Sequence, residues 1–274
     1  MKIIFIPISI TGYLLDSASE RFRCRWLAPH LNADIYDRTQ NLSDYDAIIY
    51  NKSYISEEMI ALSERHKDKF QMLDMTDIWF PFHEDNLRRM AKNCRLLTAS
   101  SADLAEELKK FGNAHYLPDR QNLDFYKARK VHINKPAILV WFGYVENFER
   151  IRPLLTYIED KELPLLIISD RPPRYAKNPI FRGEFRKWSL ETSNNDIISG
   201  DIVLNPLWKY KSNNKTTTAW ALGMPVAENE KEIERFLNWE ERRIEAKRRL
   251  KEAKEKWDIR TSAKELKNLI RRHI

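Results

Sequence analysis

The most informative stretch of this chain is Lys211-Ser212-Asn213-Asn214-Lys215-Thr216-Thr217-Thr218-Ala219-Trp220-Ala221-Leu222-Gly223-Met224-Pro225-Val226-Ala227. Its pattern is typical of a loop that enters a helix, with polar residues that can cap the first free backbone N–H groups. Gly223 suits the left-handed position after the last helical turn, and Pro225 prevents the helix from continuing into the short apolar strand that follows. Lys211 and Lys215 then lie at the positive end of a helix dipole, which attracts anions. The stretch predicts a phosphate seat, and a solvated, well-capped helix start is the alternative.

The composition indicates a globular protein. The chain has 274 residues, of which 43% are hydrophobic and 32% are charged, enough for one large core or two ordinary ones. Neither a membrane span of about 18–20 apolar residues nor a signal peptide is evident, so we expect a cytoplasmic protein. Cys24 and Cys94 are isolated in the sequence, which predicts neither a disulfide nor a zinc site.

The positive charge is concentrated near the C-terminus. The formal net charge is +7, and residues 239–274 contain 13 Lys and Arg against 7 Asp and Glu. The preceding chain is therefore close to neutral. We expect any contact with an anionic surface to involve residues 239–274.

The first part of the chain alternates between short apolar runs and amphipathic runs. The expected strands are 2–8, 34–37, 45–50, 70–75, 95–99 and 114–117. The expected helices are 18–31, 56–67, 83–93 and 101–111. This alternation predicts an α/β domain over 1–120, with a doubly wound parallel sheet.

The same alternation restarts after a polar segment at 121–136, which we expect to be a linker. Residues 137–228 predict a second Rossmann-like domain that includes the opening stretch. Residues 229–274 predict charged helices, the last of which would begin at a capping box formed by Ser262 and Glu265. Two tandem α/β domains facing a cleft are the main architectural prediction.

Ligands of open parallel sheets bind beyond the carboxyl ends of the strands. The residues that follow the expected strands are therefore the candidate site residues. In the first domain they include Asp74 and Asp77, and in the second they include Gly143 and the Lys211–Lys215 turn.

Several segments, taken in order, carry a resemblance to a known family: Ser19-Glu20-Arg21-Phe22-Arg23, Tyr45–Lys52, Leu73–Asp77, Leu97–Leu104 and Lys211–Val226. They resemble the GT-B-fold glycosyltransferases of group 1 (family 4-like), which transfer a sugar from a nucleotide-sugar donor. This resemblance spans most of the chain. It implies that the C-terminal helices cross back onto the first domain. One departure is Thr218, because the family commonly has a glutamate there that holds the donor ribose.

The resemblance implies a role for each candidate residue. Gly143, Lys211, Asn214, Lys215 and Thr218 would bind the donor, with the lysines on its diphosphate. A turn glycine, a helix-face threonine and a capped helix start are the alternatives for this set.

In the first domain, Asp77 or Asp74 would accept the proton of the acceptor hydroxyl or orient it. Ser19, Arg21 and Arg23 would reach into the cleft toward phosphate or acceptor. Ordinary helix caps, turn aspartates and surface arginines are the structural alternatives.

The resemblance further implies a metal-independent, retaining transfer in the interdomain cleft, with a UDP- or GDP-sugar as co-substrate and no bound cofactor. The acceptor is left open between a glycan, a lipid-linked sugar and a DNA base. A DNA-modifying glycosyltransferase that acts on hydroxymethylated bases, and an inactive nucleic-acid-binding protein with the same fold, are alternatives. The basic tail would accordingly pack on the first domain, touch an anionic membrane from the cytoplasmic side, or contact nucleic-acid phosphates.

Overall fold

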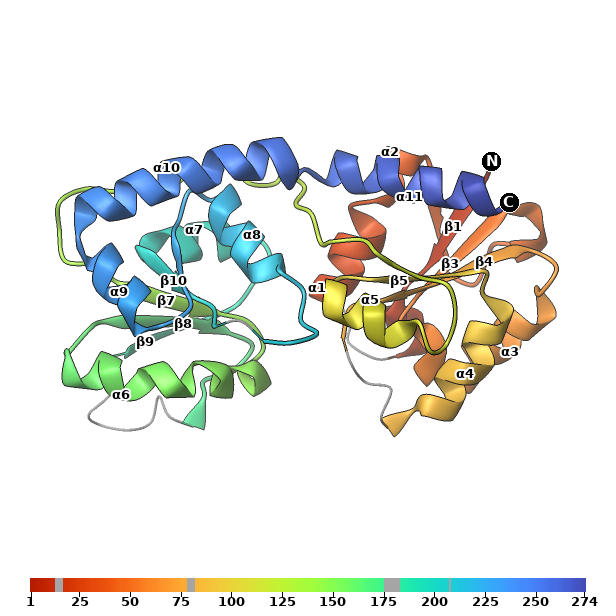
Figure 1. The fold of residues 1–274 in the computed structure, drawn as a ribbon, viewed down its shortest axis with the longest axis horizontal. Helices are drawn as coiled ribbons and strands as arrows, with labels where there is room; N and C mark the ends of the chain where they lie inside the picture. Colours follow the sequence, from red (N-terminus) through yellow and green to blue (C-terminus); the bar gives the residue numbers. More distant parts are fainter. Residues whose placement is uncertain (13–16, 78–81, 175–182, 207) are drawn as a thin grey trace. The chain divides into compact units, whose positions relative to one another are not determined.

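A computed structural model gives the fold of the chain and describes residues 1–12, 17–77, 82–174, 183–206 and 208–274. The chain divides into two compact units (Figure 1). Unit 1 contains Met1–Asn122, Lys209–Asn213 and Asp258–Ile274, and unit 2 contains Leu123–Trp208 and Asn214–Trp257. Both units are α/β with a parallel sheet, which confirms the predicted fold class.

Unit 1 is built on a six-stranded sheet in the order β2-β1-β3-β4-β5-β6. Every neighbouring pair is parallel. The strands are β1 Ile3–Ile6, β2 Asp34–Ile35, β3 Ala47–Asn51, β4 Phe70–Met75, β5 Leu96–Ala99 and β6 Ala114–Tyr116. They follow the apolar runs of the sequence because a strand buried on both faces has apolar side chains at successive positions.

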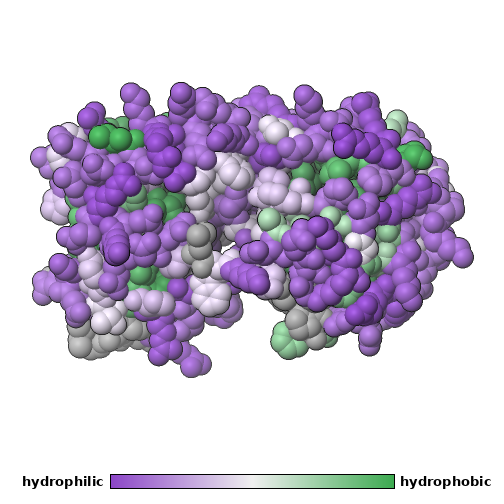
Figure 2. Space-filling view, in the orientation of Figure 1, coloured by the Kyte–Doolittle hydropathy of each residue, from purple (hydrophilic) through white to green (hydrophobic). Residues whose placement is uncertain are grey.

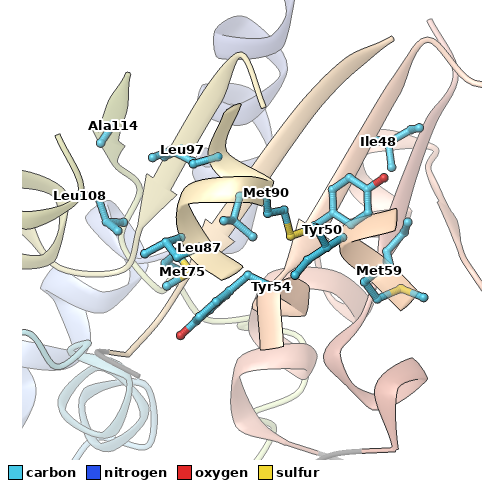
Figure 3. Close-up of a cluster of buried hydrophobic side chains, with 14 of the residues drawn as sticks. Ile48, Tyr50, Tyr54, Met59, Met75, Leu87, Met90, Leu97, Leu108 and Ala114 are labelled. Carbon is cyan, nitrogen blue, oxygen red and sulfur yellow. The ribbon is translucent and has the colours of Figure 1, made fainter. Parts of the chain in front are cut away.

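Helices cover both faces of this sheet. They are η1 Ile8–Thr11, α1 Ala18–Glu20, the π-helical η2 Arg21–Arg25, α2 Ala28–Leu31, η3 Leu42–Asp44, η4 Ser53–Ile55, α3 Glu57–Arg65, α4 Glu84–Asn93, α5 Ala102–Leu108 and α11 Ile259–His273. Alternate residues of each strand point to opposite faces, so the sheet has two cores. One core joins Ile48, Tyr50 and Leu97 to α3, α4 and α5 (Figure 3). The other joins Ile3 and Phe5 to α2 and α11.

Unit 2 is built on a five-stranded parallel sheet in the order β11-β10-β7-β8-β9. Its strands are β7 Leu139–Phe142, β8 Leu165–Ser169, β9 Gly183–Lys187, β10 Ile202–Leu204 and β11 Val226–Ala227. Its helices are η6 Val145–Ile151, α6 Arg152–Asp160, α7 Ser193–Ser199, α8 Asn214–Ala221, α9 Glu230–Leu237 and α10 Trp239–Lys256. One face of the sheet packs against α6 and α9 through Trp141, Leu155 and Phe236.

The helix predicted from the opening stretch is α8, and it ends as expected. Gly223 follows it in the left-handed conformation with φ of +74°. Its N–H donates to the carbonyl oxygen of Trp220 at 3.0 Å. The short parallel strand β11 comes next, as the apolar Val226 and Ala227 predicted.

The tail returns to unit 1 as expected, but with only one of its helices. Of the C-terminal helices only α11 belongs to unit 1, whereas α9 and α10 belong to unit 2. The final helix starts at Ile259, because Asp258 caps it by accepting from the N–H of Arg260. The predicted capping box is therefore wrong. Ser262 and Glu265 instead accept hydrogen bonds from Arg120, whose Nη1 is 2.6 Å from Glu265 Oε2.

Candidate functional site

The strand order of unit 2 identifies where a ligand would bind. The strand order reverses direction between β7 and β10. On one side of β7 lie β8 and β9, and on its other side lie β10 and β11. A crevice opens at such a switch point, beyond the carboxyl ends of the two central strands. Gly143 follows β7, and Asn205 follows β10. Side chains that gather around these two residues form the candidate site of unit 2.

Lys215, in the first turn of α8, lies against Gly143. Its ammonium is 4.5 Å from the centroid of the Trp141 ring. A Cβ on Gly143 would be only 2.5 Å from Lys215 Nζ, so a side chain at this position would displace the ammonium. Gly143 also has a φ of +143°, which disfavours other residues. The structure therefore brings together Gly143 and Lys215, which the sequence proposed for one site, and adds Trp141.

The backbone N–H of Gly143 already has a partner. It donates to the carbonyl oxygen of Ile168 at 3.0 Å. What the glycine contributes is space for the lysine. Trp141 is fixed beneath that lysine by an edge-to-face contact with Phe148, whose ring centroid is 5.0 Å away. The sequence placed Trp141 in a buried strand but gave no sign that its ring would contact a cation.

The threonines of α8 are held by hydrogen bonds. Asn205 Nδ2 donates to Thr216 Oγ1 at 2.9 Å, which ties the end of β10 to the first turn of α8. Thr218 is buried, and its hydroxyl lies 3.4 Å from the hydroxyl of Tyr126. Asn214 is the first residue of α8. Asn205 and Tyr126 were not selected from the sequence, although Asn205 does follow an apolar run and precedes Pro206.

Lys211 has a different environment, because residues 209–213 belong to unit 1. Its ammonium pairs with Asp77 Oδ1, and Lys52 Nζ pairs with Asp77 Oδ2 at 2.8 Å. Lys52 follows β3, and Asp77 follows β4. The structure thus groups Lys211 with Asp77, whereas the sequence grouped it with Lys215.

The two lysines change the acid–base chemistry of Asp77. Burial by itself would raise the pKa of this carboxyl, but the charges of Lys52 and Lys211 and their hydrogen bonds outweigh it and lower the pKa to about 2. A carboxylate with so low a pKa binds cations and accepts hydrogen bonds, but it is a weak proton acceptor.

Asp74 and Arg23 form a buried pair beneath this edge. Arg23 Nε donates to Asp74 Oδ2 at 2.9 Å, and its Nη2 contacts Oδ1. Asn51 and Thr98 donate to the same carboxylate, at 3.1 and 2.6 Å. With exposed fractions of 2% each, Asp74 and Arg23 are internal residues. The expectation that Arg23 reaches into a cleft is therefore wrong, because its guanidinium is used inside unit 1.

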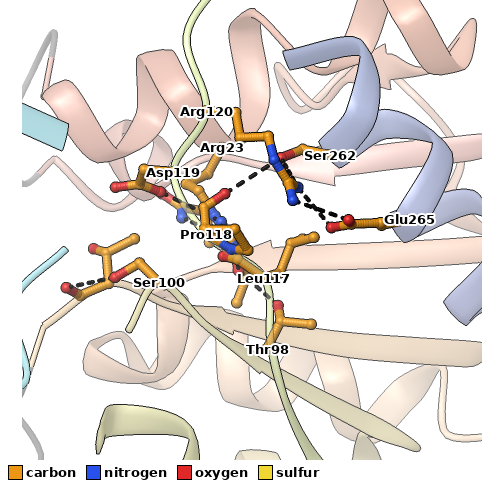
Figure 4. A network of polar contacts seen from close by, with 12 residues as sticks. Arg23, Thr98, Ser100, Leu117, Pro118, Asp119, Arg120, Ser262 and Glu265 are labelled. Carbon is orange, nitrogen blue, oxygen red and sulfur yellow. Dashed lines mark hydrogen bonds and ion pairs between the residues drawn. The ribbon is translucent and has the colours of Figure 1, made fainter. Parts of the chain in front are cut away.

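The Arg23 network continues to the loop after β6. Arg23 Nη1 donates to the carbonyl oxygen of Leu117 at 2.5 Å and lies 3.3 Å from Asp119 Oδ1 (Figure 4). Burial raises the pKa of Asp119 to about 6, although Arg23 and Ser212 act in the opposite direction. A neighbouring residue, Arg120, holds α11 through Ser262 and Glu265 in the same view.

Ser19 and Arg21 are the other two residues proposed near the N-terminus, and none of their described contacts is with Asp77. The hydroxyl of Ser19 lies 3.1 Å from the hydroxyl of Ser17, which caps α1. The Arg21 guanidinium stacks on Phe22 and Trp26, at 5.6 and 5.7 Å from their ring centroids. Glu20, which was not selected, is fully buried and accepts from the N–H of Ser9 at 3.1 Å.

The described residues show neither a metal-ligating cluster nor a membrane-spanning helix. No group of three or more His, Cys, Asp or Glu side chains among them is arranged to hold a metal ion. Among the same residues, no helix combines the length and the apolar character of a membrane span.

Comparison with known proteins gives matches at the level of structure. No family model matches the sequence, and no curated protein does. The solved structure of HepE from Anabaena in complex with UDP aligns with a TM-score of 0.69 at 12% identity, over 98% of this chain and 99% of that one. The T4 phage BGT in complex with its UDP-glucose substrate aligns with a TM-score of 0.58 at 14% identity, over 98% and 94%. A glycosyltransferase from Rickettsia africae aligns with a TM-score of 0.64 at 10% identity, over 99% and 98%.

These likenesses extend over both parallel sheets. Identities of 10–14% are too low to carry residue roles from one protein to another, so they bear on the fold. The chain has the GT-B fold that its sequence motifs predicted.

Proposed function

We propose that this protein is a glycosyltransferase that takes its sugar from a nucleoside-diphosphate donor. The observation that carries the proposal is the Lys215 ammonium, which is held at the switch point of the unit 2 sheet between Gly143 and the Trp141 ring. Lys215 is also the second residue of α8, where the helix dipole is positive. A diphosphate is the ligand that this combination of a cation and a helix N-terminus favours.

The chemistry follows from charge. In sugar transfer the bond between the anomeric carbon and the donor diphosphate breaks, its electron pair stays on the diphosphate, and the acceptor oxygen bonds to that carbon. The acceptor hydroxyl loses its proton to Asp77 or to the leaving diphosphate. Lys215 would stabilise the negative charge that grows on the leaving diphosphate. Asn214 in the same turn and Thr218 one turn further are the other proposed donor contacts.

Asp77 and Lys211 are proposed to act in unit 1. As long as both lysines are bound, Asp77 would orient an acceptor hydroxyl by accepting its hydrogen bond. Asp77 would become a stronger base if Lys211 left it and bound a donor phosphate. One of the two positive charges that lower the pKa of Asp77 would then be gone. No role in the transfer is proposed for Asp74 and Arg23, whose polar groups bind one another.

The donor is proposed to be a UDP-sugar. Solved structures with the same fold were determined with UDP and with UDP-glucose. Isothermal titration calorimetry with UDP, UDP-glucose and GDP tests this directly, in excess EDTA to include the proposal that no metal is needed. Saturable binding of UDP that is weakened at least tenfold in Lys215→Ala is the expected result, because a charge-assisted contact contributes roughly 1.5–3 kcal/mol.

The matched control is Lys187→Ala, which removes an exposed lysine at the carboxyl end of β9 in the same unit. We expect this variant to bind UDP as tightly as the parent. Absence of UDP and GDP binding in the parent would refute the proposal, as would equal affinities of the parent and Lys215→Ala.

A further inference from the structure

The exposed side of α10 carries a row of basic residues. Arg243, Lys247 and Lys254 are exposed and recur at spacings of four and seven residues, so they form one stripe on the helix. None of the three forms an ion pair with a carboxylate among the described residues. Leu250 lies in the same stripe and is partly buried. The stripe is therefore a row of positive charges without a carboxylate partner in the described part of the chain, and Arg243 lies over the Trp239 ring at 5.4 Å from its centroid.

The segment that enters unit 2 runs beside this stripe. Arg242, on the buried side of α10, donates to the carbonyl oxygens of Ile133 and Lys135 at 3.4 and 3.3 Å. At the other end, a Cβ on Gly223 would lie 3.9 Å from Leu250 Cδ2 and 3.7 Å from the carbonyl oxygen of Lys130. Residues 130–135 thus follow the helix from Leu250 back to Arg242, as the ribbon also shows (Figure 1).

Two large aliphatic side chains of this segment point to solvent. Lys130 and His132 bind inward, to the Ile198 and Gly223 carbonyl oxygens. Val131 and Ile133 alternate with them and are 76% and 54% exposed. Ile244 on the outer side of α10 is 56% exposed. Figure 2 shows a small hydrophobic patch enclosed by hydrophilic atoms over the N-terminal part of α10.

We propose that this surface, formed by Val131, Ile133, Ile244, Arg243, Lys247 and Lys254, binds an anionic lipid bilayer. Charge complementarity favours an anionic partner, and cations near a lipid headgroup layer gain from its negative potential. The aliphatic side chains decide between anionic partners. They would enter the boundary between headgroups and acyl chains, as the apolar residues of interfacial helices do. A nucleic acid would leave them facing phosphates and water, since its bases are recognised by stacking on aromatic rings.

The proposal goes beyond sugar transfer, and it is independent of the donor site. It assigns the protein a reversible attachment to membrane surfaces through unit 2. The acceptor would then be met at such a surface, whatever its chemistry.

Co-sedimentation of the full chain with vesicles tests the surface. Vesicles of phosphatidylcholine alone are compared with vesicles that contain phosphatidylglycerol in addition. We expect binding to the mixed vesicles that weakens with salt, and little binding to the neutral ones. The triple variant R243Q/K247Q/K254Q should lower the partition coefficient at least tenfold. The matched control R65Q/K67Q/K92Q removes three exposed cations from unit 1 and should have little effect.

A second variant separates a membrane from a nucleic acid. V131S/I133S/I244S keeps every charge, and we expect it to lower vesicle binding at least tenfold, since each buried methylene contributes to insertion. Its melting temperature and UDP affinity should equal those of the parent because these side chains are exposed. Equal binding to neutral and mixed vesicles would overturn the proposal. So would full vesicle binding by the serine variant, or duplex DNA binding that needs the three cations and is tighter than vesicle binding.

Discussion

The ammonium of Lys215 lies 4.5 Å from the centroid of the Trp141 ring, over a strand residue that is 1% exposed. Because Lys215 is only partly buried, a cation–π contact of this kind contributes about 1 kcal/mol. The ring also restricts where the ammonium can lie, because Phe148 holds Trp141 in place by an edge-to-face contact. The proposed phosphate seat therefore depends on a side chain that the phosphate itself would not touch.

Substitution of Trp141 should weaken UDP binding through Lys215. We expect Trp141→Phe to bind UDP about as well as the parent and Trp141→Leu to lose affinity roughly threefold to tenfold, because leucine has no π face. Calorimetry measures both. In a Lys215→Ala background the leucine substitution should have no further effect, and a further loss there would mean that Trp141 acts through packing alone.

Gly143→Ala should be more damaging than its one added methyl group suggests. The new Cβ would lie 2.5 Å from Lys215 Nζ, and the φ of +143° would be strained. We expect a loss of roughly 1–3 kcal/mol in the free energy of unfolding, together with about tenfold weaker UDP binding. Gly12→Ala is the control, since Gly12 also has positive φ but no atom lies within 4 Å of its Cβ position. It should lose stability without losing UDP affinity.

Asp74→Asn should separate stability from binding. The substitution removes the closer of the two carboxylates that pair with the buried Arg23 and leaves it only Asp119, at 3.3 Å, which costs roughly 3 kcal/mol. Chemical denaturation would measure that loss, and titration with UDP should give the affinity of the parent. An unfolding free energy equal to that of the parent, or a large loss of UDP affinity in the folded variant, would contradict the internal role assigned to Asp74.

Acid should destabilise unit 1 through Asp77. Its pKa is about 2 in the folded chain against an ordinary value of 3.8. The folded state thus binds fewer protons than the unfolded state in that range, so the stabilisation is complete above pH 3.8 and is lost as the pH falls toward 2. The loss amounts to about 2 kcal/mol. Asp77→Asn should show a correspondingly flatter dependence of unfolding free energy on pH between 4 and 2.

We expect His132 to make the free energy of unfolding depend on pH in a second, milder range. Burial lowers its pKa to about 4, and the hydrogen bond to the Gly223 carbonyl oxygen opposes this only in part. Between pH 6.5 and 4 the unfolded state binds the proton more readily, so stability should fall by about 3 kcal/mol as the pH drops through this range. Asp119, with its raised pKa, contributes the opposite slope. The measurement is therefore the difference in unfolding free energy between the parent and His132→Gln, followed from pH 6.5 to pH 4. His30→Gln, at an exposed histidine, is the control.

The sequence predicted the strands and most helices because their signals are local. The apolar runs at β3 and β7 and the glycine after α8 each specify their own few residues. The partners of Arg23 and Lys211 were not predictable in this way. Arg23 binds a carboxylate 51 residues away, and Lys211 binds one 134 residues away. Lys211 and Lys215 are close in the sequence, but the chain passes from one compact unit to the other between them.

The division of the chain has a consequence for synthesis on the ribosome. Unit 2 is complete once Trp257 has been made, whereas unit 1 still lacks α11. Ile259, Ala263, Leu266 and Ile270 of that helix share a core with Ile3 and Phe5 of the first strand. β1 therefore lacks these partners until α11 has been translated. A nascent chain would complete unit 2 before unit 1, and one face of the unit 1 sheet would be only partly covered in the interval.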